Sequence, residues 1–142
     1  MNLILSRALA DAICAQAQAA KPQECCGLLL GEADLDPGSD RVTAITPATN
    51  IAAHPEHRFE IDPAVLLAAY KAQRTGGPAI LGHYHSHPTG QPIPSLTDAE
   101  MAEGRGEYWI IVGSDGAMQG WRADATGSVH ARFDPVTLLI RD

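Results

Sequence analysis

Short apolar runs alternate along this chain with segments of helical periodicity, and this alternation constrains the fold more than any other feature of the sequence. Residues 24–31, 79–85 and 108–113 have the length and composition of strands. Within 9–17 and 66–73, apolar residues recur every three or four positions, as they do on one face of a helix. The pattern predicts an α/β domain.

Turn and cap residues divide these elements. Ser6 is a candidate N-cap for the first helix, which Pro22 ends. Asp62 and Pro63 mark the start of a second helix, and the glycines at 76–77 stop it. The other expected elements are a loop at 31–40, a short helix at 95–103 and strands at 2–5, 41–46, 58–61, 118–123 and 129–133. Because hairpins pair antiparallel strands, we expect a mixed β-sheet flanked by helices.

Composition limits the function classes. The chain has 142 residues, of which 45% are hydrophobic, so we expect one domain at residues 1–142. Its formal net charge is −7 and its arginines are scattered, which argues against a nucleic acid partner. No apolar stretch is long enough to cross a bilayer, so no membrane partner is expected. Arg7 and Asp11 interrupt the apolar N-terminal stretch, which therefore does not fit a signal peptide, and we expect a cytoplasmic protein.

The cysteines do not predict a disulfide framework. Cys14, Cys25 and Cys26 are odd in number and form no C-x-x-C pair. We interpret them as reduced thiols that act as small apolar side chains, rather than as metal or redox groups.

The segment HYHSHPTGQPIPSLTD, residues 83–98, carries the chemistry. His85 and His87 are two residues apart, so at the end of a strand both imidazoles face one side and can reach one metal ion. Asp98 follows after ten intervening residues, at the start of a helix, where a folded-back loop can supply its carboxylate as a third ligand. Two nitrogen ligands and one oxygen ligand suit zinc and leave a fourth position for water, which is typical of a catalytic site.

An H-x-H pair alone is weak evidence, because histidine is also common in cores and on surfaces. Pro88 directly after the pair, and Ser95 three residues before Asp98, strengthen the prediction. Ser95 and Asp98 also fit a helix capping box, and the same side chains can serve both purposes. Other zinc patterns fit poorly: the chain has no H-E-x-x-H and no P-C-x-x-C, and Pro88 and Thr89 stand where a metallo-β-lactamase would carry an aspartate.

The spacing resembles the JAMM motif of the MPN-plus zinc metallopeptidases. Six positions match it: Glu24, His85, His87, Pro88, Ser95 and Asp98. The resemblance covers residues 23–113, including ECCGLLLG and FEIDP, and implies a cytidine-deaminase-like α/β fold and a zinc-dependent peptidase. The chain lacks the long insertions of eukaryotic deubiquitinating relatives. It is more similar to stand-alone prokaryotic members, which are associated with ubiquitin-like proteins and sulfur carriers ending in Gly-Gly.

The resemblance also implies roles for the matched residues. A water molecule activated by Zn²⁺ would be the nucleophile, Glu24 the general base, and the Ser95 hydroxyl a donor to the oxyanion. On its residue type alone, Glu24 would be an ordinary surface charge. Each metal-site histidine should donate its second ring N–H to a further acceptor. The substrate would be a ubiquitin-like or sulfur-carrier protein whose C-terminal tail binds extended and adds a strand to an exposed sheet edge.

The remaining histidines and the tryptophans carry weaker predictions. His83 shares the parity of the two metal-site histidines, but we expect a core histidine whose hydrogen bonds are satisfied. Trp109 and Trp121 fall within strand patterns and are expected in the core. Three histidines are interpreted as surface groups or carry no prediction, although the first two could line a substrate groove: His54, His57 and His130.

Two other functions stay open. The chain could be a non-catalytic MPN-type scaffold that binds a partner protein, although such relatives lose metal ligands that are all present here. It could also be a DNA-repair-linked JAMM-like protein, which its acidic charge disfavours. The sequence does not determine the oligomeric state, or whether the leaving group is cysteine, a lysine side chain or a peptide.

Overall fold

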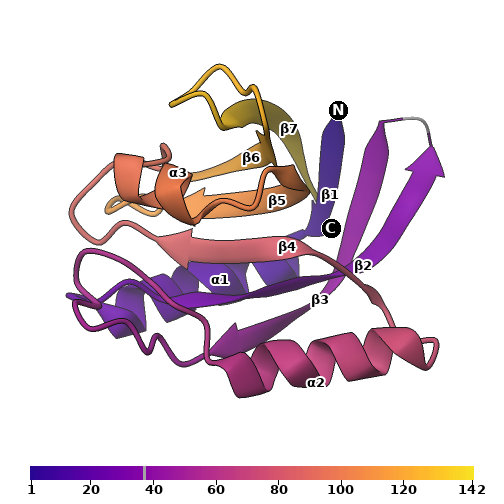
Figure 1. Ribbon diagram of the computed structural model, residues 1–142, viewed down its shortest axis with the longest axis horizontal. Coiled ribbons are helices and arrows are strands. Elements are labelled where there is room, and N and C mark those ends of the chain that lie inside the picture. The colour runs from indigo at the N-terminus through magenta and orange to yellow at the C-terminus, as the bar shows by residue number, and fades with distance from the viewer. Residues whose placement is uncertain (37) are drawn as a thin grey trace.

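The structure is a computed structural model that describes residues 1–36 and 38–142. In chain order, the elements are β1 (Asn2–Ser6), α1 (Arg7–Ala20), β2 (Cys26–Asp36), β3 (Ser39–Ala48), α2 (Pro63–Arg74), β4 (Ala79–Ser86), α3 (Leu96–Met101), β5 (Arg105–Val112), β6 (Met118–Asp124) and β7 (Phe133–Arg141) (Figure 1). The expected mixed sheet with helices against it is confirmed. Within the described residues, no helix has both the length and the apolar character needed to span a membrane.

The strands close into a barrel in the order β1-β3-β2-β4-β5-β6-β7. The pairs β1–β3, β1–β7 and β4–β5 are parallel, whereas β2–β3, β2–β4, β5–β6 and β6–β7 are antiparallel. Each strand therefore has a neighbour on both sides, but β1 pairs with β3 only at residues 39–41. Residues 42–48 of β3 pair with β2 alone, so this part of the described sheet keeps one free edge.

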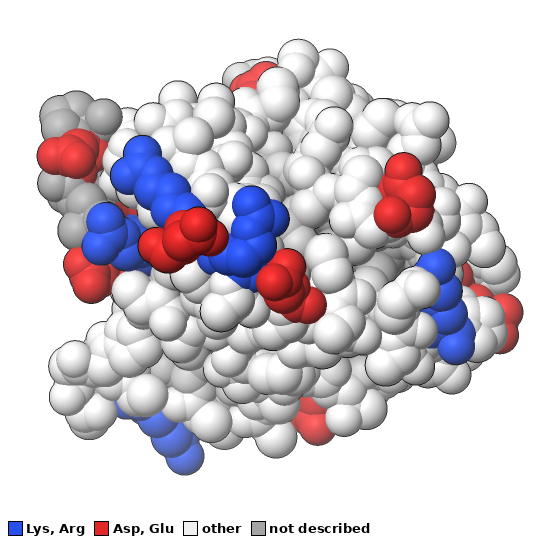
Figure 2. Space-filling model, turned by 180° about the vertical axis from the view of Figure 1, so that it is seen from behind, with Lys and Arg blue, Asp and Glu red and all other residues white. Residues whose placement is uncertain are grey.

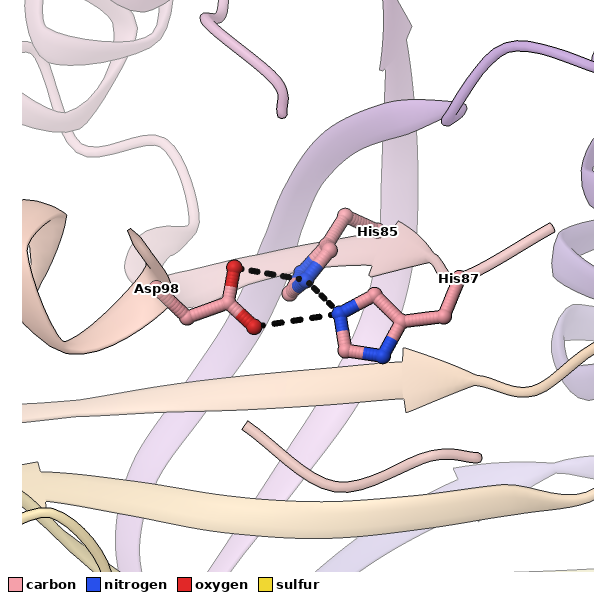
Figure 3. A group of neighbouring side chains, drawn as sticks. All are labelled: His85, His87 and Asp98. Atoms are coloured by element: carbon pink, nitrogen blue, oxygen red, sulfur yellow. Dashed lines mark hydrogen bonds and ion pairs between the residues drawn. The ribbon is translucent and has the colours of Figure 1, made fainter. Parts of the chain in front are cut away.

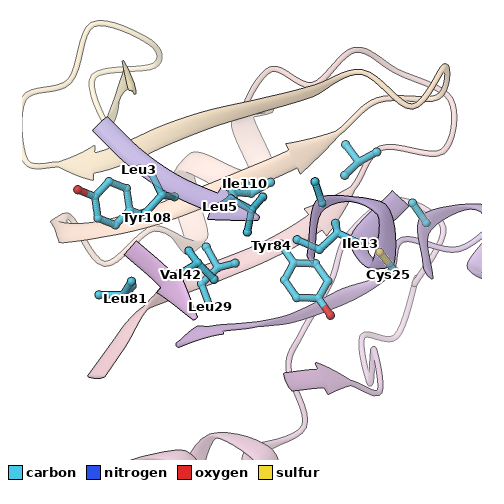
Figure 4. Packing of buried hydrophobic residues seen from close by; sticks show 13 residues of the cluster. Leu3, Leu5, Ile13, Cys25, Leu29, Val42, Leu81, Tyr84, Tyr108 and Ile110 are labelled. Atoms are coloured by element: carbon cyan, nitrogen blue, oxygen red, sulfur yellow. The ribbon is translucent and has the colours of Figure 1, made fainter. Parts of the chain in front are cut away.

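Helix α1 begins where the sequence predicts, because the Ser6 hydroxyl accepts a hydrogen bond from the Leu9 N–H at 3.1 Å. Its apolar stripe, Ala10, Ile13 and Ala17, is buried against the larger of two cores. This core lies between α1 and the strands (Figure 4). The other core contains Cys26, Phe59, Trp109, Ile111, Trp121, Ala123 and Phe133.

Strand β4 separates these two cores. Because successive side chains of a strand face opposite sides, Tyr84 joins the larger core while His85 faces the aromatic residues of the second. A register shift against β2 occurs one residue before Gly82. A Cβ added at Gly82 would lie 2.0 Å from the Tyr108 carbonyl oxygen, so only glycine allows β5 to approach here.

Three expectations differ from the structure. The loop expected at 31–40 is mostly strand, since β2 continues to Asp36 and β3 starts at Ser39; position 37 lies outside the described residues. The strand expected at 58–61 is reduced to one bridge between Asn50 and Ile61. The strand expected at 129–133 instead starts at its last residue, as β7.

Helix α2 also differs from its amphipathic pattern. Asp62 caps it as predicted, accepting a hydrogen bond from the Ala64 N–H at 3.0 Å. None of its residues is buried, however, and Leu67 and Tyr70 are 55% and 46% exposed. Figure 1 shows α2 running along the outside of the barrel, where it contacts β4. On the face seen in Figure 2, basic and acidic side chains are interspersed and form no single basic patch.

Candidate metal centre

The carboxyl end of β4 presents two histidines on one face. His85 lies within the strand, paired with Cys26 of β2 and Ile111 of β5. His87 follows the strand end, and its N–H donates to the Val112 carbonyl at 2.8 Å, which prolongs the ladder with β5. Both rings are therefore carried by rigid backbone, as the spacing of two residues predicts.

A capping box orients the carboxylate. The Ser95 hydroxyl accepts from the Asp98 N–H at 3.0 Å, and Asp98 Oδ2 accepts from the Ser95 N–H at 2.9 Å. These bonds start α3 and hold Asp98 in one rotamer. The preceding loop is held by the Trp121 indole N–H, which donates to the Pro92 carbonyl at 3.0 Å, and by His130 Nε2, 3.0 Å from the Pro94 carbonyl.

The three side chains converge at one point (Figure 3). His85 Nε2 is 3.1 Å from Asp98 Oδ1, His87 Nε2 is 3.1 Å from Asp98 Oδ2, and the two Nε2 atoms are 3.2 Å apart. Ligand atoms at about 2.0–2.1 Å from zinc in tetrahedral geometry lie about 3.3 Å from one another. The spacing of these atoms therefore fits one zinc ion, and the donor set of two imidazoles and one carboxylate is one that zinc accepts.

The electrostatics favour the protonation states that a metal needs at Asp98 and His85, but not at His87. Burial alone raises the pKa of Asp98, but the two histidines and the Ser95 N–H more than offset it and hold that pKa well below its usual range. Burial lowers the pKa of His85, which is fully buried and so stays neutral. Burial also opposes protonation of His87, but its hydrogen bonds to Asp98 and Gln91 and the nearby carboxylates raise its pKa. An ionised carboxylate and neutral imidazoles are the ligand forms.

The second ring nitrogens of the two histidines differ. His87 Nδ1 lies 2.8 Å from the Gln91 carbonyl, the kind of acceptor that was expected. His85 Nδ1 has no hydrogen-bond partner among the described residues, so the prediction was wrong for this ring. The second core surrounds it with aromatic side chains instead: Phe59 stacks on it with ring centroids 4.4 Å apart, and Trp109 meets it edge-on.

Glu24 lies just before β2 and is 6% exposed, so it is not the solvated charge that its residue type suggests. Burial raises its pKa to about 8, His87 lowers it and Asp98 raises it. The next residue, Cys25, exchanges hydrogen bonds with Ser86, which lies between the two metal-site histidines, so Glu24 is located at the carboxyl end of β4. Its Oε1 has no hydrogen-bond partner among the described residues. A buried carboxyl that titrates near neutral pH is suited to take and return a proton.

His83 is not the satisfied core histidine that we expected. Its ring packs edge-on against Trp109 at 4.2 Å, and burial lowers its pKa to about 3. Its Nδ1 nevertheless has no hydrogen-bond partner among the described residues. His83 lies on the wall of a cavity of about 650 Å³ between α2, β4 and β5.

The other sequence predictions have clear outcomes. Both tryptophans are buried, as expected, and His54 and His57 are exposed. All three cysteines are free, and burial raises the pKa of Cys26 to about 12, so this thiol stays protonated. The sequence reading missed Phe59 and the loop contact of His130. Phe59 belonged to the expected strand at 58–61 and to the FEIDP segment, but neither pattern indicated its contact with His85, and nothing in the sequence indicated the contact of His130.

One protein family matches most of the chain. Residues 6–124 match the family described as prokaryotic homologs of the JAB domain. The desampylase of Haloferax volcanii is 38% identical over 105 residues, covering 72% of this chain and 73% of that protein. A probable TtuB-protein conjugate cleaving protease of Thermus thermophilus is 38% identical over 79 residues, 56% of this chain and 53% of that protein. The CysO-cysteine peptidase of Mycobacterium tuberculosis is 29% identical over 110 residues, 78% of this chain and 72% of that protein.

Solved structures show the same architecture. A protein of Desulfitobacterium hafniense superposes with a TM-score of 0.82 and 27% identity, covering 99% of this chain and 93% of that one. A JAB1/MPN domain protein from Archaeoglobus fulgidus superposes with a TM-score of 0.61 over 97% of this chain and 98% of that one. Its identity of 20% supports the fold alone.

Proposed function

Because this chain belongs to the prokaryotic homologs of the JAB domain, stand-alone members of the JAMM/MPN family, we propose that it is a zinc-dependent peptidase acting on the C-terminus of a ubiquitin-like or sulfur-carrier protein. The observation that carries the proposal is the triangle of His85, His87 and Asp98 ligand atoms with a buried carboxyl, Glu24, beside it. The proposal includes the assignment of residues 1–142 to one catalytic domain and the cytidine-deaminase-like classification of its fold.

Each proposed site residue has one task. His85, His87 and Asp98 hold the zinc ion, which when bound lowers the pKa of a water molecule and polarises the scissile carbonyl. Glu24 takes a proton from that water at its carboxylate and returns it to the leaving nitrogen as the amide bond breaks.

Ser95 assists through its hydroxyl. The hydroxyl oxygen already accepts the Asp98 N–H, which fixes the side chain and leaves its proton to be donated. We propose that this O–H donates a hydrogen bond to the oxygen of the scissile carbonyl as negative charge develops there. The capping box therefore links the third ligand to the oxyanion donor.

The names of the relatives support the substrate class. They are a desampylase, a protease that cleaves TtuB–protein conjugates and a CysO-cysteine peptidase. We propose that an extended C-terminal tail adds a strand to the free edge at residues 42–48 of β3, which ends where Ala48 pairs with Cys26 beside Glu24.

The test uses a ubiquitin-like protein ending in Gly-Gly, joined through its terminal carboxyl to cysteine, to the ε-amine of a lysine peptide or to a following peptide. Mass spectrometry follows release of the free Gly-Gly terminus. We expect hydrolysis of at least one linkage by wild-type protein, and none by Glu24→Gln protein that retains zinc. Equal hydrolysis by both would remove Glu24 from this role. Binding of the carrier without any cleavage would favour the non-catalytic scaffold.

A further inference from the structure

The main chain of Glu24 lies outside the hydrogen-bond ladder of the barrel. Strand β2 begins two residues later, at Cys26. The Glu24 N–H donates to the Pro55 carbonyl at 2.8 Å, and its carbonyl accepts from Asn50 Nδ2 at 3.0 Å. The loop between β3 and α2 therefore sets the position of this residue.

Asn50 organises that loop. Besides the Glu24 carbonyl, its Nδ2 group donates to the Arg58 carbonyl at 3.0 Å and, at 3.4 Å, to the Pro55 carbonyl. Its Oδ1 accepts from the N–H groups of Ala52 and Glu60, both at 3.1 Å. Both ends of the amide are thus used, and every partner is main chain.

The same side chain also fixes the ring that covers His85. Asn50 bonds to the carbonyl of Arg58 and to the N–H of Glu60, the two residues that flank Phe59. Phe59 is 3% exposed and stacks on His85. One amide therefore connects the proposed general base to the aromatic wall on the proposed metal ligand.

From this geometry we propose that Asn50 is a positioning residue that holds the Glu24 carboxyl beside the metal centre. The inference rests on the proposed peptidase function. Because Glu24 Oε1 has no hydrogen-bond partner among the described residues, its place depends on the backbone that Asn50 fixes. Asparagine is required because an aspartate would turn a carboxylate oxygen toward the carbonyls of Glu24 and Arg58.

The experiment compares Asn50→Asp, which keeps the acceptor and replaces the donor, with Asn50→Ala, which removes both. Glu56→Gln is the matched control, an exposed change in the same loop. For each zinc-loaded protein, zinc per chain, kcat and KM are measured with the cleaved conjugate. Amide hydrogen exchange at Glu24 and Glu60 is measured in the same samples and in metal-free protein.

We expect both Asn50 variants to retain zinc, to lose kcat by about 10- to 100-fold and to keep KM within about twofold. Exchange at Glu24 should rise about tenfold or more in both variants, exchange at Glu60 should rise in Asn50→Ala, which loses its acceptor, and the control should match wild type throughout. Wild-type kcat in zinc-loaded Asn50→Asp, or unchanged exchange in both variants, would overturn the inference. Loss of zinc or of the fold in both variants would also overturn it, since Asn50 would then support the domain in general.

Failure of the peptidase proposal has a different signature. Wild-type protein would then cleave no conjugate, while the exchange data would still report whether Asn50 holds Glu24.

Discussion

At the scale of single residues, Glu24 has the most unusual environment in the site. Its carboxyl is buried without a hydrogen-bond partner for Oε1 among the described residues, and burial raises its pKa to about 8. A proton on this group is therefore retained in the folded protein at pH values where the unfolded chain has lost it. The same burial that suits Glu24 to proton transfer should make the metal-free protein sensitive to pH.

The direction of this pH dependence follows from the linkage between proton binding and folding. Between the ordinary carboxyl pKa of 4.5 and the folded value of about 8, the folded state binds the proton and the unfolded state does not. The free energy of unfolding should therefore fall as pH rises through this interval. We expect Glu24→Gln to gain stability relative to metal-free wild type between about pH 5 and about pH 9, by on the order of a few kcal/mol.

Urea unfolding of both metal-free proteins across this range measures the difference. A constant difference between them at all pH values would show that Glu24 titrates normally. Asp98 should act in the opposite direction, because its pKa is lowered: its contribution to stability is lost as pH falls through the acid range.

Residue-scale chemistry was also what the sequence predicted best. The two-residue spacing of His85 and His87 and the capping pattern at Ser95 depend on local geometry, and the structure brings these groups together. The lack of a hydrogen-bond partner for His85 Nδ1 among the described residues was not predictable, because it depends on Phe59, which a distant loop packs against this ring. Asn50 was missed for the same reason: its partners are main-chain groups that only the fold assembles.

At the scale of elements, the loop between β4 and α3 sets the position of Asp98. Trp121 of β6 is 6% exposed and donates its indole N–H to the Pro92 carbonyl. We expect Trp121→Phe to leave that buried carbonyl unpaired, to lower the free energy of unfolding by about 1–3 kcal/mol and to weaken zinc binding by about tenfold.

Zinc titration against a competing chelator measures the zinc affinity, and denaturant unfolding measures the free energy of unfolding. Phe133→Leu is the control, because Phe133 shares the second core but its side chain has no group that could hydrogen-bond to this loop. It should lower stability and leave zinc affinity near that of wild type. If both variants lose zinc affinity equally, core packing rather than the loop contact positions Asp98.

The elements themselves were predictable where a local pattern decides them. Ser6 and Asp62 cap their helices as expected. The long pairing of β2 with β3, the reduction of 58–61 to one bridge and the exposure of α2 were not predictable, because they depend on which distant segments lie beside them. The apolar pattern of α2 predicts burial against a core, but α2 lies outside the closed barrel (Figure 1) and none of its residues is buried.

At the scale of the whole molecule, the domain is built from a closed barrel and two hydrophobic cores. Closure was not predictable from the sequence, because the β1–β7 and β1–β3 pairings join distant strands. We expect this framework to fold without zinc, unlike a zinc finger, which stays unfolded until the metal binds.

Metal removal tests whether the fold is independent of the zinc ion. We expect chelation to leave the far-UV circular dichroism spectrum unchanged and to lower Tm, since a ligand that binds only the folded state stabilises it by mass action. Added zinc should restore Tm in wild type and leave Asp98→Asn unchanged. Loss of secondary structure on chelation would mean that the metal is structural.

The central claim is that His85, His87 and Asp98 hold one zinc ion with a position left for water. Zinc K-edge X-ray absorption of purified, zinc-loaded protein tests it most directly. The account predicts one zinc per chain with two imidazole nitrogens and two oxygen ligands at about 2.0–2.2 Å. Sulfur scattering at about 2.3 Å, which would place a cysteine on the metal, or a chain that takes up no zinc, would contradict it.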